Sequence, residues 1–382
     1  MAFSFVLLIC AGLMMRSLYN LLSIDPEFKS ANVLSMNVNL NWTRYAELSV
    51  QNTFFRQILD RAQQIPGTET VALSSIVPLN RDSGGMNAGI LFEGRALPPG
   101  EPLPRVDYEL ATPDYFHVLG VPMLSGRAFT DADTRDSTHI AIINAQMAKH
   151  YWPEESPIGH RVSEDNGKTW TTIVGVVSNI HQYGVDKDFV DGIYFPQAQV
   201  AFMGDPHLLI RTRNDPDQVA RQMVSIIQQI DPQQPVTDIH TLDQLRSEQM
   251  GTPRVTSLLL SLFAGVALFI TVVGVTGALG LSVAHRTKEI GIRIALGATR
   301  PEILQNILMR GMSPVIAGVV VGAATAILAT RVISTMLFAI RPNDPPTFIA
   351  ITILLGLVAF IGCAIPARRA VKVDPMKALR NE

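Results

Sequence analysis

The sequence predicts a membrane protein with four transmembrane α-helices and a large α+β domain inserted between helix 1 and helix 2. Four apolar runs, one at the N-terminus and three in the last third of the chain, reach the roughly 20 residues that a helix needs to cross a bilayer. Residues 25–250 between them are polar and mix strand-like with helix-like patterns. Charged residues make up only 17% of the 382 residues, against about 25% in an average soluble chain. Part of the chain is therefore expected to lie in lipid.

The first apolar run, residues 1–24, contains one charged residue, Arg16. A cleaved signal peptide is the alternative, since Cys10 lies in a stretch that faintly resembles a lipoprotein cleavage box. Signal peptides begin with basic residues and are cleaved after small ones. This run has no Lys or Arg before Phe3 and has Ile9 before Cys10, so we favour a retained transmembrane helix. The absent basic flank also suggests that the chain is the tail of a longer reading frame.

Three further transmembrane helices are expected at residues 251–285, 303–333 and 346–367. The linker 286–302 and the tail 368–382 are rich in Lys and Arg, whereas the short loop 334–345 is not. Because basic loops stay in the cytoplasm, we place the linker and the tail there. With four spans the N-terminus is then also cytoplasmic, and residues 25–250 lie outside.

The outer domain, residues 25–250, is expected to form two lobes. Its two ends, residues 25–77 and 207–250, each follow the order strand, helix, strand, and two such β-α-β units pack into one α+β layer. The two helices show apolar residues at helical spacing, such as Ile58 and Ala62 in the first and Met223 and Ile227 in the second. The intervening residues 78–206 combine Gly and Pro with short β-prone runs, which predicts a second, mainly β lobe.

Several functional classes are disfavoured by what the sequence lacks. No G-x-x-x-x-G-K-[ST] loop is present, so we expect neither nucleotide binding nor another cofactor in this chain. No His or Cys spacing fits a metal site, and a net charge of −2 gives no field to attract nucleic acid. The apolar cores contain no Asp, Glu, Lys or His, which argues against an ion-coupled transporter. Acidic pairs such as Asp107/Glu109 are expected to be solvated loop residues and not catalytic groups, so we expect no enzyme.

The linker after the second helix is basic and amphipathic. As a helix it would place Ile290, Ile294 and Ala298 on one face. Two interpretations stay open, a helix lying in the membrane interface with its basic side in water and a docking helix for a cytoplasmic partner. Gly291 and Gly297 favour docking, because each destabilises a helix by about 1 kcal/mol relative to alanine and permits close backbone approach. The candidate docking residues are Arg286, Lys288, Glu289, Ile290, Gly291, Arg293, Ala295, Gly297 and Ala298.

Small residues recur at about one-turn spacing in the second and third helices. Gly318 and Gly322 form a GxxxG element in the third helix, and Gly274 and Gly277 lie similarly in the second. Such residues let two helix backbones approach closely in lipid, where association depends on packing. Transmembrane helices are rich in glycine in any case. Helix-packing contacts and ordinary composition therefore stay equally open as explanations.

Several motifs resemble those of one protein family. The segment HRTKEIGIRIALGATR at residues 285–300 resembles the stretch after the second span of the MacB/FtsX family of ABC transporter permeases. The sequences PARRA at 366–370 and DPMKALR at 374–380 resemble that family's ending. In the outer domain, matches at residues 113–116, 119–120, 126–127, 151–153 and 157–159 look like the MacB-type periplasmic core domain. The resemblance covers essentially the whole chain, and details are similar to the second half of duplicated orphan permeases.

The resemblance implies a multi-pass permease subunit in the inner membrane of a bacterium, with a large periplasmic domain and cytoplasmic termini. It implies that residues 286–298 form a coupling helix that docks on a separate cytoplasmic ABC ATPase. It also implies pairing with a second copy or with another permease half, and a periplasmic adaptor or the substrate as a further partner. ATP-driven motion would then pass through the membrane helices to the periplasmic domain and drive export or extraction.

Two other functions stay open at this point. FtsX-like relatives use ATPase motion to regulate a periplasmic enzyme, and copurification of a hydrolase would indicate that function. A membrane-anchored binding or sensor module would have no ATPase partner, so a neighbouring gene with a phosphate-binding loop argues against it.

The predicted orientation is testable with reporter fusions. A reporter that is active only in the periplasm is expected to be active after Gln249 and inactive after Lys288, because the basic linker should stay in the cytoplasm. A reporter that is active only in the cytoplasm serves as the control and should give the reverse pattern. Periplasmic activity after Lys288 would contradict the orientation.

Overall fold

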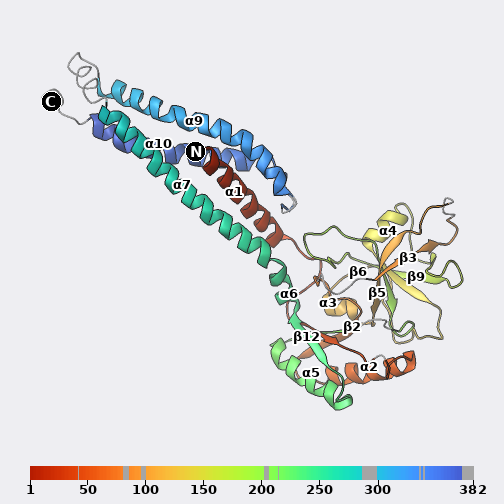
Figure 1. The fold of residues 1–382 in the computed structure, drawn as a ribbon. Helices are drawn as coiled ribbons and strands as arrows, with labels where there is room; N and C mark the ends of the chain where they lie inside the picture. Colours follow the sequence, from red (N-terminus) through yellow and green to blue (C-terminus); the bar gives the residue numbers. More distant parts are fainter. Residues whose placement is uncertain are drawn as a thin grey trace. The chain divides into compact units, whose positions relative to one another are not determined.

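The structure is a computed structural model that describes residues 1–41, 43–80, 86–95, 100–201, 206–213, 215–285, 299–334, 337–338 and 340–371. It divides into two compact units, one made of Met1–Ser23 with Met250–Glu382 and the other of Ile24–Gln249. We call them the membrane unit and the outer domain (Figure 1). All nine candidate docking residues between Arg286 and Ala298 lie outside the described residues, as does the DPMKALR motif.

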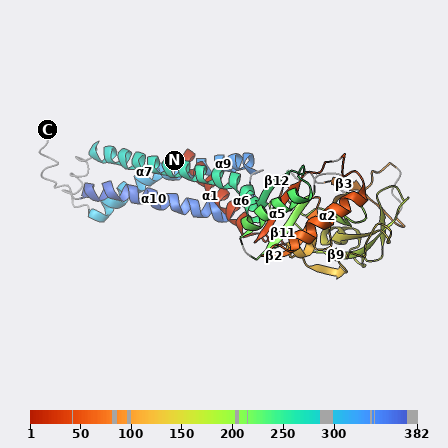
Figure 2. The same cartoon turned by 90° about the horizontal axis from the view of Figure 1, so that it is seen from below.

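The membrane unit consists of four long helices that run lengthwise beside one another (Figure 2). They are α1 (Ala2–Ser23), α7 (Gly251–His285), α9 (Arg300–Val332) and α10 (Pro345–Val371). Helices long and apolar enough to cross a bilayer occur at Ala2–Ser23, Leu242–Ser282, Leu304–Val332 and Pro345–Ala364. The predicted fold class, four transmembrane helices with a large α+β domain between the first and the second, is confirmed.

The two ends of the outer domain form the predicted pair of β-α-β units. The strands are β1 (Val33–Val38), β2 (Thr68–Ser74), β11 (His207–Thr212) and β12 (Val236–Thr241). They pair antiparallel in the order β12-β1-β11-β2, with Leu34 opposite Ile210. Helices α2 (Leu48–Gln63) and α5 (Pro216–Ile230) lie side by side against these strands (Figure 1). Ile58, Met223 and Ile227 are fully buried there, and each contributes about 1.5–3 kcal/mol of hydrophobic stabilisation.

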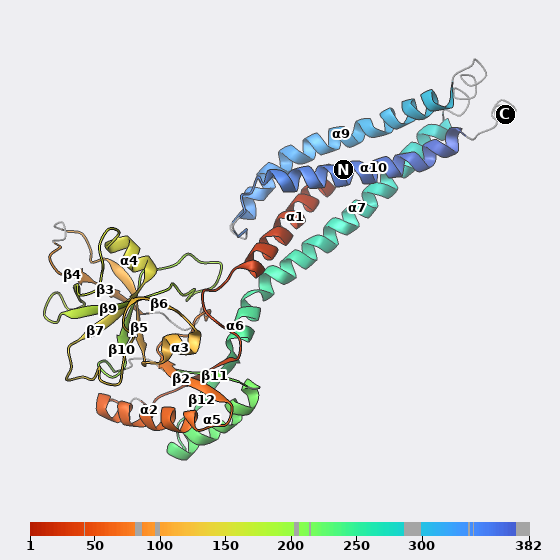
Figure 3. The ribbon, with the colours of Figure 1, turned by 180° about the vertical axis from the view of Figure 1, so that it is seen from behind.

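The intervening residues form the predicted second lobe, which is mainly β. Its strands follow the order β5-β10-β7-β9-β8-β4, with β3 added at β5 and β6 at β9. Figure 3 shows these strands from behind. The strands are β3 (Met86–Gly89), β4 (Leu91–Phe92), β5 (Arg105–Ala111), β6 (Met123–Gly126), β7 (Ile140–Asn144), β8 (Arg161–Ser163), β9 (Thr171–Val177) and β10 (Gly192–Pro196), and the helices of the domain outside the β-α-β units are α3 (Tyr115–Leu119), α4 (Ala145–Tyr151) and α6 (Leu242–Gln249).

A glycine crossing explains one of the outer-domain motifs. Gly126 has φ +77°, and a Cβ built on it would lie 2.1 Å from the carbonyl oxygen of Val174. A Cβ on Gly175 would lie 2.5 Å from the carbonyl oxygen of Arg127. Only glycine fits such a close approach of two strands with a left-handed backbone. Glycine is therefore required at positions 126 and 175 by the packing of β6 against β9.

The two lobes share one sheet, in which β2 and β5 pair at their last residues. Ser74 lies opposite Ala111, and backbone hydrogen bonds join the Ser75 N–H to Leu110 and the Thr112 N–H to Leu73. We call this junction the seam. At this seam Glu109 on β5 is 3% exposed. The Ser74 hydroxyl donates to its Oε1 at 2.6 Å and the Gln182 amide donates to its Oε2 at 2.7 Å. The expectation that Glu109 is a solvated loop residue is therefore wrong, because it lies on a strand and faces the interior.

Burial raises the pKa of the Glu109 carboxyl from 4.5 to about 8. A carboxyl that binds its proton more tightly in the folded state stabilises the fold at low pH. That stabilisation is lost as the pH rises from the unfolded pKa through the folded pKa. The free energy of unfolding is therefore expected to fall between about pH 4.5 and about pH 8, compared with a protein that has a non-titrating side chain at position 109.

The substitution Glu109→Gln is expected to remove this pH dependence, because the amide is neutral and still accepts the hydrogen bond from Ser74. The measurement is denaturant unfolding of the full chain in detergent, followed by tryptophan fluorescence, since Trp42, Trp152 and Trp170 all lie in the outer domain. Relative to Glu109→Gln, the unsubstituted protein should lose on the order of a few kcal/mol of stability between about pH 5 and about pH 9. A stability difference between the two proteins that stays constant across that pH range would contradict a raised pKa of the buried Glu109 carboxyl.

Candidate functional site: the membrane helix bundle

The predicted glycine contacts fall into two groups in the structure. A Cβ on Gly318 of α9 would lie 2.5 Å from the Cβ of Met1, and one on Gly322 would lie 2.9 Å from the Cβ of Phe5. The GxxxG element of α9 therefore lies directly against α1. Among the described residues, a Cβ on Gly274 or Gly277 of α7 would meet no atom within 4 Å. Gly274 lines a cavity inside the bundle, and neither glycine brings α7 into close contact with another described helix.

Helix α1 contributes most of the buried core of the membrane unit. Phe5, Ile9 and Leu13 are completely buried, and they follow the helical spacing of four residues. Ala326 of α9 and Leu355 of α10 belong to the same cluster. Lipid tails are as apolar as these side chains, so close packing and hydrogen bonds must hold the helices together.

Hydroxyl side chains join α1 to α7 at two levels. The Ser4 and Thr271 hydroxyls are 2.7 Å apart, and Ser4 also donates to the carbonyl oxygen of Ala267 at 3.2 Å. Further along the pair, the Ser257 hydroxyl donates to the carbonyl oxygen of Met14 at 3.3 Å. Each hydrogen bond between membrane helices contributes about 0.6–2 kcal/mol. The sequence analysis missed these contacts, although the signal was a few Ser and Thr residues inside apolar runs.

A second set of polar contacts joins α1 to the connection between α9 and α10. Arg16 Nη1 lies 2.5 Å from Asp344 Oδ2, and Ser17 Oγ accepts a hydrogen bond from the Phe338 N–H at 2.8 Å. Arg16 lies in the last third of α1 with its side chain 45% exposed, and Asp344 lies outside the stretches apolar enough to cross a bilayer. Arg16, as the one charged residue of the first apolar run, was the sequence signal for this ion pair, but Asp344 was not predicted as its partner.

Asp344 also caps the start of α10, which begins at Pro345. Its Oδ2 accepts hydrogen bonds from the Thr347 N–H at 3.1 Å and from the Thr347 hydroxyl at 2.6 Å, as an N-cap residue does. Burial alone would raise the pKa of the Asp344 carboxyl, but the bonds from Thr347 and the charge of Arg16 outweigh burial and lower it. Asp344 is therefore ionised at neutral pH and holds both α1 and the start of α10.

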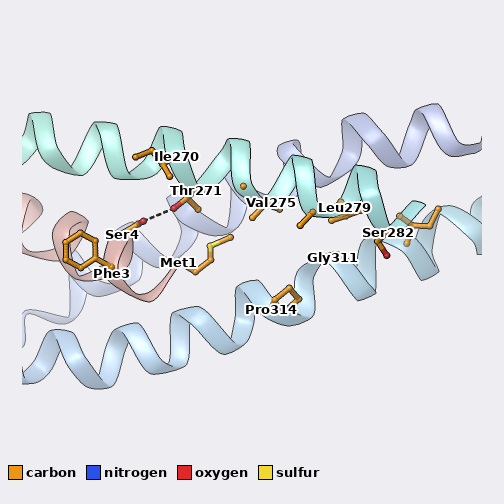
Figure 4. A pocket seen from close by; sticks show the side chains of 13 residues that line it. Met1, Phe3, Ser4, Ile270, Thr271, Val275, Leu279, Ser282, Gly311 and Pro314 are labelled. Atoms are coloured by element: carbon orange, nitrogen blue, oxygen red, sulfur yellow. Dashed lines mark hydrogen bonds between the residues drawn. The ribbon is translucent and has the colours of Figure 1, made fainter. Parts of the chain in front are cut away.

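A cavity of about 640 Å³ lies between the first turn of α1 and the facing sides of α7 and α9 (Figure 4). Its walls are mostly apolar, with Ser4, Thr271 and Ser282 as polar groups. At Gly311 the backbone of α9 lies against a side chain of α7, because a Cβ there would lie 2.3 Å from Leu279 Cδ1. In the part of the chain that the structure describes, no group of three or more His, Cys, Asp or Glu side chains is arranged to hold a metal ion.

Fold and bundle together define an integral membrane protein whose large mixed domain is carried between the first and second of four helices. Models of two known families match the chain. The FtsX-like permease C-terminal model matches residues 261–375, and the MacB-like periplasmic core domain model matches residues 3–226. The chain therefore belongs to the ABC transporter permeases that combine a MacB-like periplasmic core domain with an FtsX-like permease domain, which confirms the resemblance. The outer domain is accordingly a periplasmic domain.

Individual relatives are distant. The macrolide export ATP-binding/permease protein MacB 2 of Aeromonas hydrophila is 27% identical over 279 residues, which cover 70% of this chain and 42% of that protein. The uncharacterized ABC transporter permease YknZ of Bacillus subtilis is 26% identical over 284 residues, which cover 70% and 68%. The crystal structure of the periplasmic region of MacB from Actinobacillus actinomycetemcomitans aligns with a TM-score of 0.41 and 11% identity over 61% of this chain and 98% of that one. The match thus spans about two fifths of the MacB relative.

Enlarging a glycine that touches α1 is expected to destabilise the membrane unit. The change Gly318→Leu forces atoms into space that Met1 occupies, and overpacking of this kind costs about 1–3 kcal/mol. The measurement is the temperature at which the detergent-solubilised protein loses its monodisperse peak in size-exclusion chromatography. The matched control is Gly265→Leu, since a Cβ on Gly265 meets nothing within 4 Å. Equal melting of both variants would contradict the close approach of α1 and α9.

Proposed function

We propose that this chain is the permease subunit of a MacB-type ABC transporter. In this proposal it passes the motion of a cytoplasmic ATPase through the membrane helices to the periplasmic domain, and so drives export or extraction of a substrate. The observation that carries the proposal is the direct connection of the candidate docking segment to two membrane helices. The candidate docking segment is joined to the last residue of α7, His285, on one side and to the first of α9, Arg300, on the other.

A firm helix start supports the transfer of motion into α9. Thr299 and Glu302 form a capping box, in which the Glu302 carboxylate accepts the Thr299 N–H at 3.0 Å. Such a box satisfies backbone donors at the helix N-terminus. A displacement of the segment before Thr299 would then be passed directly to α9, which begins at the next residue.

The other ends of α1 and α7 lead into neighbouring strands. Strand β1 is the first strand after α1, and β12 is the last strand before α7. These two strands pair with each other, with Leu34 opposite Thr241. Movement of either helix would therefore act on the same strand pair of the periplasmic domain. Because β1 also pairs with β11, that movement would spread into the whole β-α-β lobe.

The ATPase is proposed to be a separate subunit. The relative in Aeromonas hydrophila is named as an ATP-binding and permease protein in one chain, whereas these 382 residues contain no phosphate-binding loop. ABC permeases act in pairs, so we also propose a second copy or another permease half as partner. The exposed Gly277 on α7, where an added Cβ would meet nothing within 4 Å among the described residues, is compatible with such a partner.

Replacing Glu289 and Arg293 together by Ala is expected to reduce copurification of the ATPase, because both charged side chains belong to the candidate docking segment. The measurement is the amount of ATPase recovered with affinity-tagged permease from membranes. The control is the pair Glu101→Ala and Arg105→Ala, two exposed residues of the periplasmic domain. Equal recovery with the docking variant and the control would contradict docking, provided that both reach the membrane in equal amounts.

A further inference from the structure

The connection between α9 and α10 is fastened to α1 at the end of α1 that leads into the periplasmic domain. Three contacts lie within six residues of α1. A Cβ on Gly12 would lie 3.1 Å from Thr347 Cγ2, Arg16 pairs with Asp344, and Ser17 accepts from the Phe338 N–H. They attach α1 to the connection before α10 and to the first turn of α10.

The ion pair is the charged contact of the three. The Arg16 side chain is 45% exposed and the Asp344 side chain is 15% exposed. The same oxygen, Asp344 Oδ2, accepts from Arg16, from the Thr347 N–H and from the Thr347 hydroxyl. Sliding α1 along α10 would separate this charged contact together with the hydrogen bond from the Phe338 N–H to Ser17.

The position of this pair matters for the path of motion. Helix α9 begins just after the candidate docking segment and runs to the connection, and α10 returns from it. Helix α1 continues into Ile24 and then into β1. Residues 12–17 of α1 thus contact the α9–α10 connection and the first turn of α10, and the chain continues from the end of α1 into the β-α-β lobe.

We propose that Arg16 and Asp344 form a fixed joint that makes α1 move together with the α9–α10 hairpin. Arg16 and Asp344 are then positioning residues for the transfer of motion, a role that rests on the proposed function. Asp344 performs two tasks, as cap of α10 and as counter-charge of α1. The conservative change Asp344→Asn separates them, because asparagine still caps a helix but carries no charge.

The joint is tested by distances between spin labels, measured by pulsed electron paramagnetic resonance on the full chain in nanodiscs. Labels at Tyr19 of α1 and Ile349 of α10 report on the joint, since both side chains are exposed. Labels at Val273 of α7 and Phe360 of α10 serve as control, near the hydrogen bond from Thr276 to Gly362. Cys10 and Cys363 are first replaced by Ala, so that only the introduced cysteines react.

Without nucleotide, Arg16→Gln and Asp344→Asn are each expected to broaden the distance distribution between Tyr19 and Ile349, and to leave the control pair unchanged. The double variant should broaden it no further than either single variant, because all three remove the same contact. Unchanged widths in monodisperse protein would overturn the joint. This nucleotide-free experiment needs no ATPase, so it tests the joint even if the proposed function is wrong.

The second arm uses the permease with its copurified ATPase, with and without ATP and vanadate. The distance between Tyr19 and Ile349 is expected to stay constant in the unsubstituted complex and to change with nucleotide in Arg16→Gln, while ATP hydrolysis continues. A purely structural role would not create a nucleotide-dependent shift. A shift already present in the unsubstituted complex would overturn the joint, and absence of any bound ATPase would overturn the proposed function instead.

Discussion

Polar contacts between helices hold α1 at the centre of the membrane unit. Ser4 with Thr271 and Ser257 with Met14 join it to α7 by buried hydrogen bonds, and Arg16 pairs with Asp344 just before the start of α10. A buried hydrogen bond between membrane helices has no water to replace it when it opens. The bundle is therefore a set of helices with few alternative alignments. Rigid alignment is the property that a transmitter of motion requires.

Packing adds to this constraint from the side of α9. Gly318 and Gly322 bring the α9 backbone against Met1 and Phe5, so α1 is enclosed by close contacts as well as by polar ones. Packed helices are not continuously deformable, because a packed interface has only a few discrete arrangements. A small movement of one helix is therefore passed on to the helices packed against it. In the periplasmic domain the seam, with Ser74 opposite Ala111 and the buried Glu109 beside them, joins the two lobes into one sheet.

Elements defined by local pattern could be predicted from the sequence, and those defined by distant partners could not. The apolar runs and the two β-α-β units follow from hydrophobic periodicity, which needs only neighbouring residues. Glu109 was misjudged because its partners Ser74 and Gln182 are 35 and 73 residues away, and no local signal marks that strand as buried. Spacing identified Gly318 and Gly322 as small residues on one face, but it did not indicate that α1 covers them. Arg16 stood out as a charge in an apolar run, while Asp344 lies 328 residues away.

The most direct test of the account is hydrogen exchange of the reconstituted permease with its ATPase, compared with and without ATP and vanadate. If motion passes through the bundle, backbone exchange in β1, β12 and the strands at the β2–β5 seam should change with nucleotide. An ATPase variant that cannot bind nucleotide should abolish the change. Nucleotide-dependent exchange that stops at the ends of α7 and α9 next to the candidate docking segment, with none in the periplasmic domain, would contradict the transfer of motion.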